Sequence, residues 1–194
     1  ISVADFTLAI AIQNLVWGIT QPIIGAFADK FGCRVLTILG TSLYAAGIGM
    51  TMVATGPVML IIGLGVMIGL ALACTSLSLA LASSARAVSA ARRSVVLGTI
   101  SAAASIGSFI AAPLAQGLIS TEGWLMAMVA FLGLCAVMLP AAFFVGSGDK
   151  AAAEMAKNST DHDAKLSLKE VLWQASRHKG YVTMALAYFV CGLQ

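Results

Sequence analysis

The hydrophobic positions of the chain form five long uncharged runs, separated by short polar connections. Each run has at least about 20 residues, enough for an α-helix to cross the ~30 Å hydrocarbon core of a bilayer. A sixth apolar run begins at Tyr181 and continues to Gln194. The pattern therefore predicts an all-α membrane protein, a multi-span helical bundle with five full transmembrane helices and a truncated sixth. The five full helices are predicted at Phe6–Phe27, Val35–Ala54, Val58–Ala82, Val95–Ile119 and Trp124–Val145.

The connections between the runs differ in charge. Every Lys and Arg lies in one of three segments, 28–34, 84–94 and 147–180, whereas the connections 55–57 and 120–123 have none. Positively charged connections stay on the cytoplasmic side of a membrane. The sequence therefore predicts that the three basic segments are cytoplasmic.

Composition supports the lipid bilayer as the main partner, because 60% of the residues are hydrophobic and only 10% are charged. A soluble domain has about a quarter charged residues. The net charge of +3 is spread along the chain, so no nucleic-acid partner is expected. The four cysteines fall one per segment, which predicts apolar packing and neither a disulfide framework nor a metal site. No cofactor is predicted.

The polar stretch 147–180 divides the chain into three predicted parts. Residues 1–146 hold the five helices, 147–180 form a linker, and 181–194 begin a further helix. The first half of the linker is small and charged, which predicts a mobile segment. Its second half has a capping-box spacing, Ser167 to Glu170, and predicts a short amphipathic helix. That helix is expected either on the membrane surface or packed on the bundle. Because the chain begins at Ile1 and ends within an apolar run, we expect it to be a piece of a longer protein.

One short connection, GAFADKFGCR at 25–34, has more features than a simple loop needs. Gly25 is expected to let the helix end approach a neighbour. Asp29 is expected to cap the next helix or to face the positive end of another helix dipole. Gly32 is expected to adopt a positive φ. Lys30 and Arg34 are able to pair with Asp29. The combination predicts a latch that holds helix ends in one arrangement.

The pattern G-x-x-x-D-[RK]-x-G-x-[RK] between two spanning helices resembles the signature loop of the major facilitator superfamily. Its matching residues are Gly25, Asp29, Lys30, Gly32 and Arg34, whereas Cys33 stands where many members have another basic residue. The resemblance implies a partial major facilitator fold, from the second helix to the early seventh. It also implies that Asp29 stabilises the outward-facing state through the opposite half of the protein, with Arg34 as an ion-pair partner. A bacterial cytoplasmic (inner) membrane is the expected location.

Four other stretches resemble the monocarboxylate and oxalate/formate branch of that superfamily. They are ARRSVVLG at 91–98, SIGSFIAAPLAQGLI at 105–119, EGW at 122–124 and FVCGLQ at 189–194, although Leu125 stands where members often have an arginine. The resemblance implies a small organic anion, a monocarboxylate or dicarboxylate, as substrate, with protons as a possible coupling ion. It also implies that the substrate's cationic partners lie on the first and eighth helices of the family.

A drug or metabolite efflux antiporter of the superfamily is the alternative function. Members with that function usually carry an arginine in the fourth helix, and the run 58–82 has no charge. An intramembrane enzyme is not expected, because the helices lack a base near any nucleophile. No catalytic residue is therefore predicted. A channel or sensor without a transport cycle stays open, and a saturable flux would distinguish a carrier from it.

Neutral polar residues are the candidates for a substrate path. On the first predicted helix Gln13, Trp17 and Gln21 share one face, with Asn14 beside them. An amide facing lipid costs free energy, so this face either lines a path or makes interhelical hydrogen bonds. The remaining path candidates are Ser101, Ser105 and Gln194.

Small residues predict two close helix contacts. Gly65 and Gly69 have the G-x-x-x-G spacing that favours close packing in membranes. On the fourth predicted helix, Ala104, Ser108 and Ala112 share a face and predict tight packing there as well.

Overall fold

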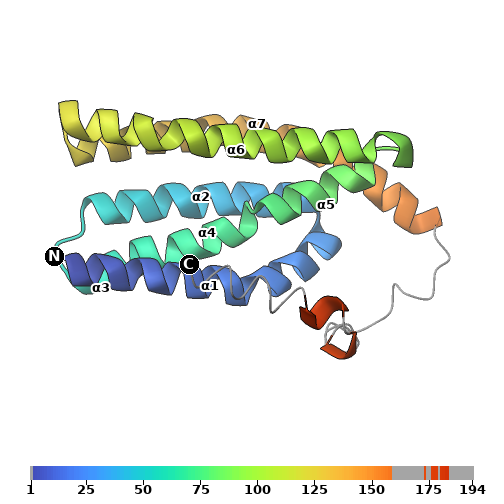
Figure 1. Cartoon of the computed structure of the whole chain (residues 1–194), viewed down its shortest axis with the longest axis horizontal. Coiled ribbons are helices and arrows are strands. Elements are labelled where there is room, and N and C mark those ends of the chain that lie inside the picture. The colour runs from blue at the N-terminus through green and yellow to red at the C-terminus, as the bar shows by residue number, and fades with distance from the viewer. Residues whose placement is uncertain (1, 159–172, 174–175, 179, 184–194) are drawn as a thin grey trace. The chain divides into compact units, whose positions relative to one another are not determined.

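The computed structural model of the chain describes residues 2–158, 173, 176–178 and 180–183. The chain divides into two compact units, Ile1–Ala156 and Lys157–Gln194. The described elements, shown in Figure 1, are α1 (Val3–Phe31), α2 (Cys33–Met52), α3 (Pro57–Leu60), the π-helix η1 (Ile61–Met67), α4 (Ile68–Cys74), α5 (Leu77–Ala87), α6 (Ala90–Glu122) and α7 (Trp124–Asn158). All of them lie in the first unit except the last two residues of α7.

Five stretches of these helices are long and apolar enough to cross a membrane: Val3–Ala28, Cys33–Met52, Pro57–Ala85, Ala91–Glu122 and Trp124–Ala142. They coincide with the five predicted runs, so the predicted all-α bundle is confirmed. The third span is not one continuous helix, because it consists of α3, η1, α4 and α5 in succession.

Single glycines form two of the connections between spans. Gly32 alone separates α1 from α2, and Gly123 alone separates α6 from α7. Their φ angles are 83° and 87°, and no other described residue has a positive φ. Residues that have a Cβ rarely adopt this backbone conformation. The positive φ predicted at Gly32 is therefore confirmed.

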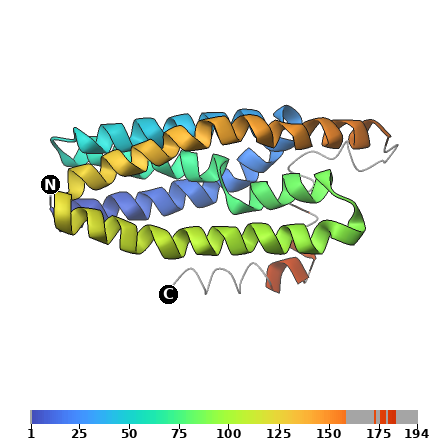
Figure 2. The same cartoon turned by 90° about the horizontal axis from the view of Figure 1, so that it is seen from above.

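The third span packs closely against both α1 and α2, and Figures 1 and 2 show the three running side by side. A Cβ placed on Gly65 would lie 3.1 Å from the backbone oxygen of Ala9, and one on Gly69 would lie 2.8 Å from that of Gln13. The close contact predicted at this glycine pair is thus confirmed, and α1 is the partner.

On its other side the third span contacts α2 through a second set of glycines. A Cβ on Gly47 would lie 2.9 Å from the Gly63 carbonyl oxygen. One on Gly40 would lie 2.6 Å from Cys74 Cβ. Because these contacts reach backbone atoms on both neighbours, the third span up to Cys74 is held between α1 and α2.

Helix α7 contributes to the largest apolar cluster of the unit. Cys135 is buried there with Ile48 of α2 and Ile68 of α4, and Met128 and Phe131 of α7 pack against them. The cysteines at 33, 74 and 135 are all buried, which confirms the predicted packing role for these three. Cys191 lies outside the described residues.

Helix α6 is the most exposed of the five spans. Ala104, Ser108 and Ala112 are exposed, so the tight packing predicted on this face is wrong for the described chain. Small side chains permit a close contact, but a neighbouring helix must also be present. Large apolar side chains are also exposed, with 80% of Phe109 and 71% of Val95 accessible. Such exposure is costly in water, which agrees with a lipid environment for these spans.

The polar segment after the fifth span begins as helix. Helix α7 continues to Asn158, so the mobile linker predicted from residue 147 is wrong for residues 147–158. Proline at 140 does not end the helix, as lipid-spanning helices tolerate it. In the second unit, Trp173 and Arg177 are helical and the Arg177 guanidinium lies 4.0 Å from the centre of the Trp173 ring. The predicted capping box at Ser167 and Glu170 lies outside the described residues.

Replacing Gly47 by Ala is expected to destabilise the bundle by about 1–3 kcal/mol. The added Cβ would lie 2.7 Å from Ile68 Cγ1 and 2.9 Å from the Gly63 oxygen, so backbone must shift. The control is Gly49→Ala on the same helix, where a Cβ meets nothing within 4 Å. Both variants gain the same helix propensity. The difference between their free energies of unfolding in detergent micelles therefore measures the clash, and equal values would contradict the close contact.

Candidate functional site

The segment Gly25–Arg34 is almost entirely helical. Gly25, Asp29 and Lys30 lie in the last turns of α1, and Arg34 is the second residue of α2. Gly32 is the N-cap of α2 and has no side chain to cap it. The side chain of Asp29 lies outside the described part of the chain, so its predicted capping and pairing stay predictions. The connection is a single-residue turn, tighter than the loop predicted from the sequence.

Gly25 does not make the close helix contact that was predicted for it. A Cβ added there would meet nothing within 4 Å. The close approach of a neighbouring helix predicted at this position is therefore absent among the described residues. Gly25 instead lies beside open space between α1 and α5.

An aromatic pair strengthens the end of α1. The Phe27 and Phe31 rings stack with centroids 5.7 Å apart and planes 17° from parallel. The Lys30 ammonium lies 5.3 Å from the centre of the Phe31 ring, within range of a cation–π contact. This group was not predicted from the sequence. The spacing of four between the two phenylalanines is the signal, because such residues lie on one helix face.

The turn also has a small core of its own. Ala28 of α1, Cys33 and Leu36 of α2, and Leu79 of α5 are buried together, with Ile24 packed against them. Leu79 is the only member from the third span. The end of α1 and the start of α2 are therefore joined to α5 by apolar packing.

Helix α5 begins after a break in the third span. Thr75 has φ −113° and ψ 19°, and Ser76 is extended with φ −64° and ψ 149°. The Thr75 N–H donates to the Ala71 oxygen at 3.0 Å, which ends α4. The Ser76 oxygen accepts from the Leu79 N–H at 3.1 Å, which starts α5. The hydrophobic run 58–82 predicts one continuous helix here. Ser and Thr favour caps over helix interiors, so the sequence TSLS at 75–78 is the signal that identifies the break.

A cavity of about 260 Å³ lies between α1 and the break. The polar residues of its lining are Gln21, Ser76 and Ser78, and the hydroxyl oxygens of the two serines lie 3.0 Å apart. The lining has no ionisable side chain. The complete lining is Gln21, Ile24, Gly25, Ala28, Ser76, Ser78, Leu79 and Ala82. The cavity can therefore offer neutral hydrogen-bond donors and acceptors to a ligand.

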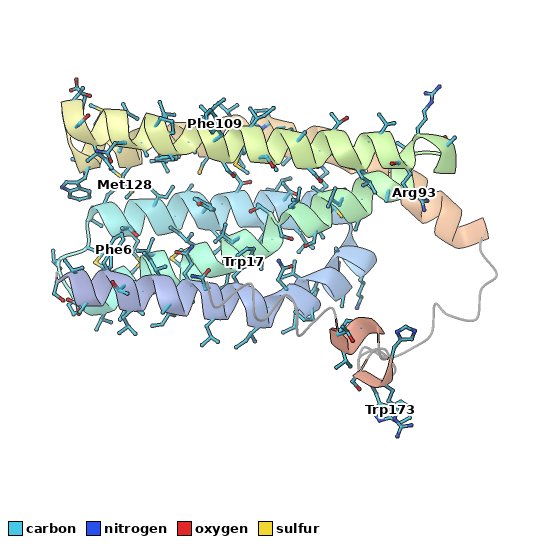
Figure 3. All side chains as sticks on the ribbon, in the orientation of Figure 1. Phe6, Trp17, Arg93, Phe109, Met128 and Trp173 are labelled. Carbon is cyan, nitrogen blue, oxygen red and sulfur yellow. The ribbon has the colours of Figure 1, made fainter. Side chains whose placement is uncertain are left out.

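The other predicted path residues of α1 lie outside this lining. Gln13 is half-buried, and its backbone oxygen faces Gly69. Asn14 is exposed and its Nδ2 donates to the Ile10 oxygen at 3.1 Å. Trp17, labelled in Figure 3, is 37% exposed. Among the path residues predicted on α1, only Gln21 lines the cavity.

The serines predicted on the fourth span are also separate from the cavity. Ser101 is half-buried and Ser105 is exposed on α6. The Ser105 hydroxyl donates to the Ser101 backbone oxygen at 3.1 Å, four residues back. Such a bond satisfies a hydroxyl in lipid without a partner helix. Gln194 lies outside the described residues.

The basic residues gather at the cavity's end of the unit. Lys30 is in the last turn of α1, and Arg92 and Arg93 are in the first turn of α6. Figures 1 and 3 show the α1–α2 and α5–α6 turns at one end, where Arg93 is labelled, with the α2–α3 and α6–α7 turns at the other. This arrangement agrees with the alternation of charge in the sequence. Among the described residues, no group of three or more His, Cys, Asp or Glu could hold a metal ion.

Comparison with known proteins gives a match over the whole chain. The family model described as Major Facilitator Superfamily matches residues 1–194. No curated protein and no solved structure matches the chain.

Replacing Gly32 by Ala is expected to lower the free energy of unfolding by about 1–3 kcal/mol, the usual cost of a Gly-only backbone conformation. The residue has φ 83° and ψ 158°, and it must turn the chain between two helices. Gly25→Ala is the control, because an added Cβ there meets nothing within 4 Å. Thermal unfolding of both variants in detergent measures the difference. A Gly32→Ala variant as stable as Gly25→Ala would show that the turn carries no strain.

Proposed function

Because the chain belongs to the Major Facilitator Superfamily, a family of membrane transporters, we propose that it forms part of a secondary transporter for a small organic anion, a monocarboxylate or dicarboxylate. Transport proceeds by alternating access, in which two halves rock about a central substrate site. The proposal takes the monocarboxylate and oxalate/formate branch as the relevant one. The protein resides in a bacterial cytoplasmic membrane, with segments 28–34, 84–94 and 147–180 on the cytoplasmic side.

The observation that carries the proposal is the cavity between α1 and the broken third span. Broken helices in transporters commonly form substrate sites, because their free backbone groups and polar side chains face a cavity. Here Gln21, Ser76 and Ser78 line the same space. Amide and hydroxyl hydrogens donate to carboxylate oxygens. The cavity lies toward the basic end of the unit, so we assign it to the cytoplasmic part of the path.

The charge pattern supports an anionic substrate. The lining of the cavity carries no negative side chain that would repel a carboxylate. Lys30, Arg92 and Arg93 lie at the same end of the unit, in the first or last turns of their helices. A positive potential there raises the local concentration of small anions. We assign the cation that pairs with the anion at mid-membrane to other helices of the intact transporter. The groups that couple transport to protons are assigned to the same helices.

The segment Gly25–Arg34 acts in this proposal as a conformational latch. Its five motif residues lie at the turn between α1 and α2. Gly32 and the small core around Ala28 and Leu79 hold that turn in place. A rigid helix end holds the Asp29 backbone in one position. Asp29 then favours the outward-facing state through contacts with the opposite half, and Lys30 and Arg34 balance its charge.

The intact protein in liposomes is expected to take up formate, oxalate or lactate saturably. Replacing Gln21 by Leu is expected to lower uptake about tenfold, since a hydrogen bond to a charged group contributes about 1.5–3 kcal/mol. The matched control is Gln116→Leu, a glutamine on the exposed side of α6. Uptake of radiolabelled acid is measured with and without a proton gradient.

Uptake of none of these acids by the wild type would contradict the substrate proposal. Extrusion of lipophilic drugs by the same liposomes would then favour the efflux antiporter. Equal uptake by Gln21→Leu and Gln116→Leu would remove the cavity from the path.

The latch is tested by Asp29→Asn, which removes the charge and keeps the shape. Loss of one charge contact of about 1 kcal/mol shifts a two-state equilibrium about fivefold toward the inward-facing state. The maleimide reaction of a cysteine at Ser78, in a background without native cysteines, is expected to accelerate accordingly. Asp5→Asn at the opposite end of α1 is the control. Equal rates in both variants would show that Asp29 does not bias the state.

A further inference from the structure

The break in the third span leaves backbone oxygens without their helix partners. Helix α4 ends where the Thr75 N–H donates to the Ala71 oxygen at 3.0 Å, and Ser76 is already extended. In a continuous helix the Ala73 and Cys74 carbonyls would accept from the N–H groups four residues further on, but the described chain has no such bonds at the break. The last carbonyls of a helix point beyond its end and carry its partial negative charge. The end of α4 therefore presents carbonyl oxygens to the break.

Ser76 starts α5 but does not cap it through its side chain. It is the N-cap residue and is only 8% exposed. An N-cap serine usually accepts a bond from an N–H two or three residues further on, but the Ser76 side chain makes no such bond. Its hydroxyl oxygen lies instead 3.0 Å from that of Ser78. In such a pair one hydroxyl donates and the other accepts, so each oxygen keeps at least one lone pair. Both oxygens therefore have acceptor capacity that the helix does not use.

The cavity beside the break adds further oxygen atoms. Gln21 of α1 lines it together with Ser76 and Ser78, and a glutamine side chain has one amide oxygen. Ala73 lies on the α1 side of the span, because Gly69, four residues earlier, faces the α1 backbone. Two hydroxyls, one amide and one backbone carbonyl thus belong to residues around the same break. All four oxygens are neutral.

We propose that the break binds a sodium ion through the hydroxyl oxygens of Ser76 and Ser78, the Gln21 amide oxygen and the Ala73 carbonyl oxygen. The role of the ion in transport rests on the proposed function, in which the same cavity admits a carboxylate. The sodium ion then supplies the positive charge that the cavity lining does not have.

The oxygen atoms suit a hard monovalent cation. Two oxygens 3.0 Å apart can both lie within the ~2.3–2.6 Å at which hard cations of this size bind oxygen. Carbonyls released where a helix unwinds, and the C-terminal ends of half-helices, coordinate sodium in transporters. Calcium and magnesium sites draw on carboxylates, and the lining has none. A proton has no titratable group to bind in this lining, so sodium is the ion that the oxygens fit.

The helix ends at the break favour binding of the sodium ion and the carboxylate as a pair. Helix α4 ends there with its negative end, and α5 begins there with its positive end. Figure 2 shows that α5 does not continue the axis of α4. Lys30, Arg92 and Arg93 lie at the same end of the unit, and their potential attracts anions and opposes a lone cation. The two ligands therefore raise each other's affinity.

Binding of radiolabelled sodium to the intact protein in nanodiscs tests the site without transport. We expect saturable binding to the wild type that excess unlabelled sodium displaces, and that potassium, calcium and choline do not. Ser76→Ala and Ser78→Ala each remove one oxygen and are expected to weaken binding at least about tenfold, since a contact with a charged group contributes that much. Ser78→Thr keeps the hydroxyl and is expected to retain binding.

The matched control is Ser83→Ala on the same helix. The Ser83 hydroxyl donates to the Ala80 oxygen at 3.1 Å, and Ser83 is not part of the cavity lining. In choline chloride, equal thermal midpoints for all variants report that each one is folded. Sodium is expected to raise the midpoint of the wild type and of Ser83→Ala, but not that of Ser76→Ala. Equal sodium binding by the wild type, Ser76→Ala and Ser78→Ala would overturn the site, as would displacement by potassium or calcium.

Organic-acid uptake gives a second readout. Replacing sodium by choline on the side of uptake is expected to lower the wild-type rate at least about fivefold, and formate or oxalate is expected to tighten sodium binding by a similar factor. Uptake that is unchanged in choline would overturn the role of sodium in transport. A wild type that moves none of the acids overturns the proposed substrate, and the loss of sodium binding in Ser76→Ala then decides the cation site alone.

Discussion

Close backbone contact between the third span and its two neighbours is the constraint on which the rest of the unit depends. In lipid, apolar side chains gain little by leaving one apolar environment for another, so helices associate through close packing. Glycines at 63, 65 and 69 bring the third span against the backbones of α1 and α2. These contacts hold the third span in place before the break, whereas the end of α1 and the start of α2 are joined to α5 by the separate core of Ala28, Cys33, Leu36 and Leu79. The cavity exists because the close packing ends at Cys74 while α1 continues.

The large features of the fold could be predicted from hydrophobic pattern and charge. Five uncharged runs of sufficient length leave the backbone few alternatives to helix in lipid, and the five spans follow from that. Gly32 was predicted to have a positive φ because its short connection needs a sharp turn, and it does. Gly65 and Gly69 were predicted to make a close contact, but the sequence does not say that α1 is the partner. The spacing of small residues identifies a surface and not what covers it, which is why the same reasoning was wrong for Ala104, Ser108 and Ala112.

The candidate site could be predicted only in part. Gln21 was singled out for its face on α1, and it does line the cavity. Ser76 and Ser78 were missed because hydropathy treats a hydroxyl within an apolar run as a small interruption. Whether such a residue bonds to the preceding turn or ends the helix depends on tertiary packing. The extension of α7 to Asn158 has a similar origin: the run DKAAAEMAK has a linker-like charge content, but its alanines, glutamate and lysines are good helix formers.

The single-residue turn at Gly32 also has a consequence for how the protein is made. Because Gly32 alone separates α1 from α2, no loop is available to hold one helix at the bilayer surface while the other crosses it. We therefore expect the two helices to enter the membrane together as a helical hairpin during biosynthesis. Their orientation would then be set for the pair, and Lys30 and Arg34, at the tip of that hairpin, are the charges expected to favour the cytoplasmic side.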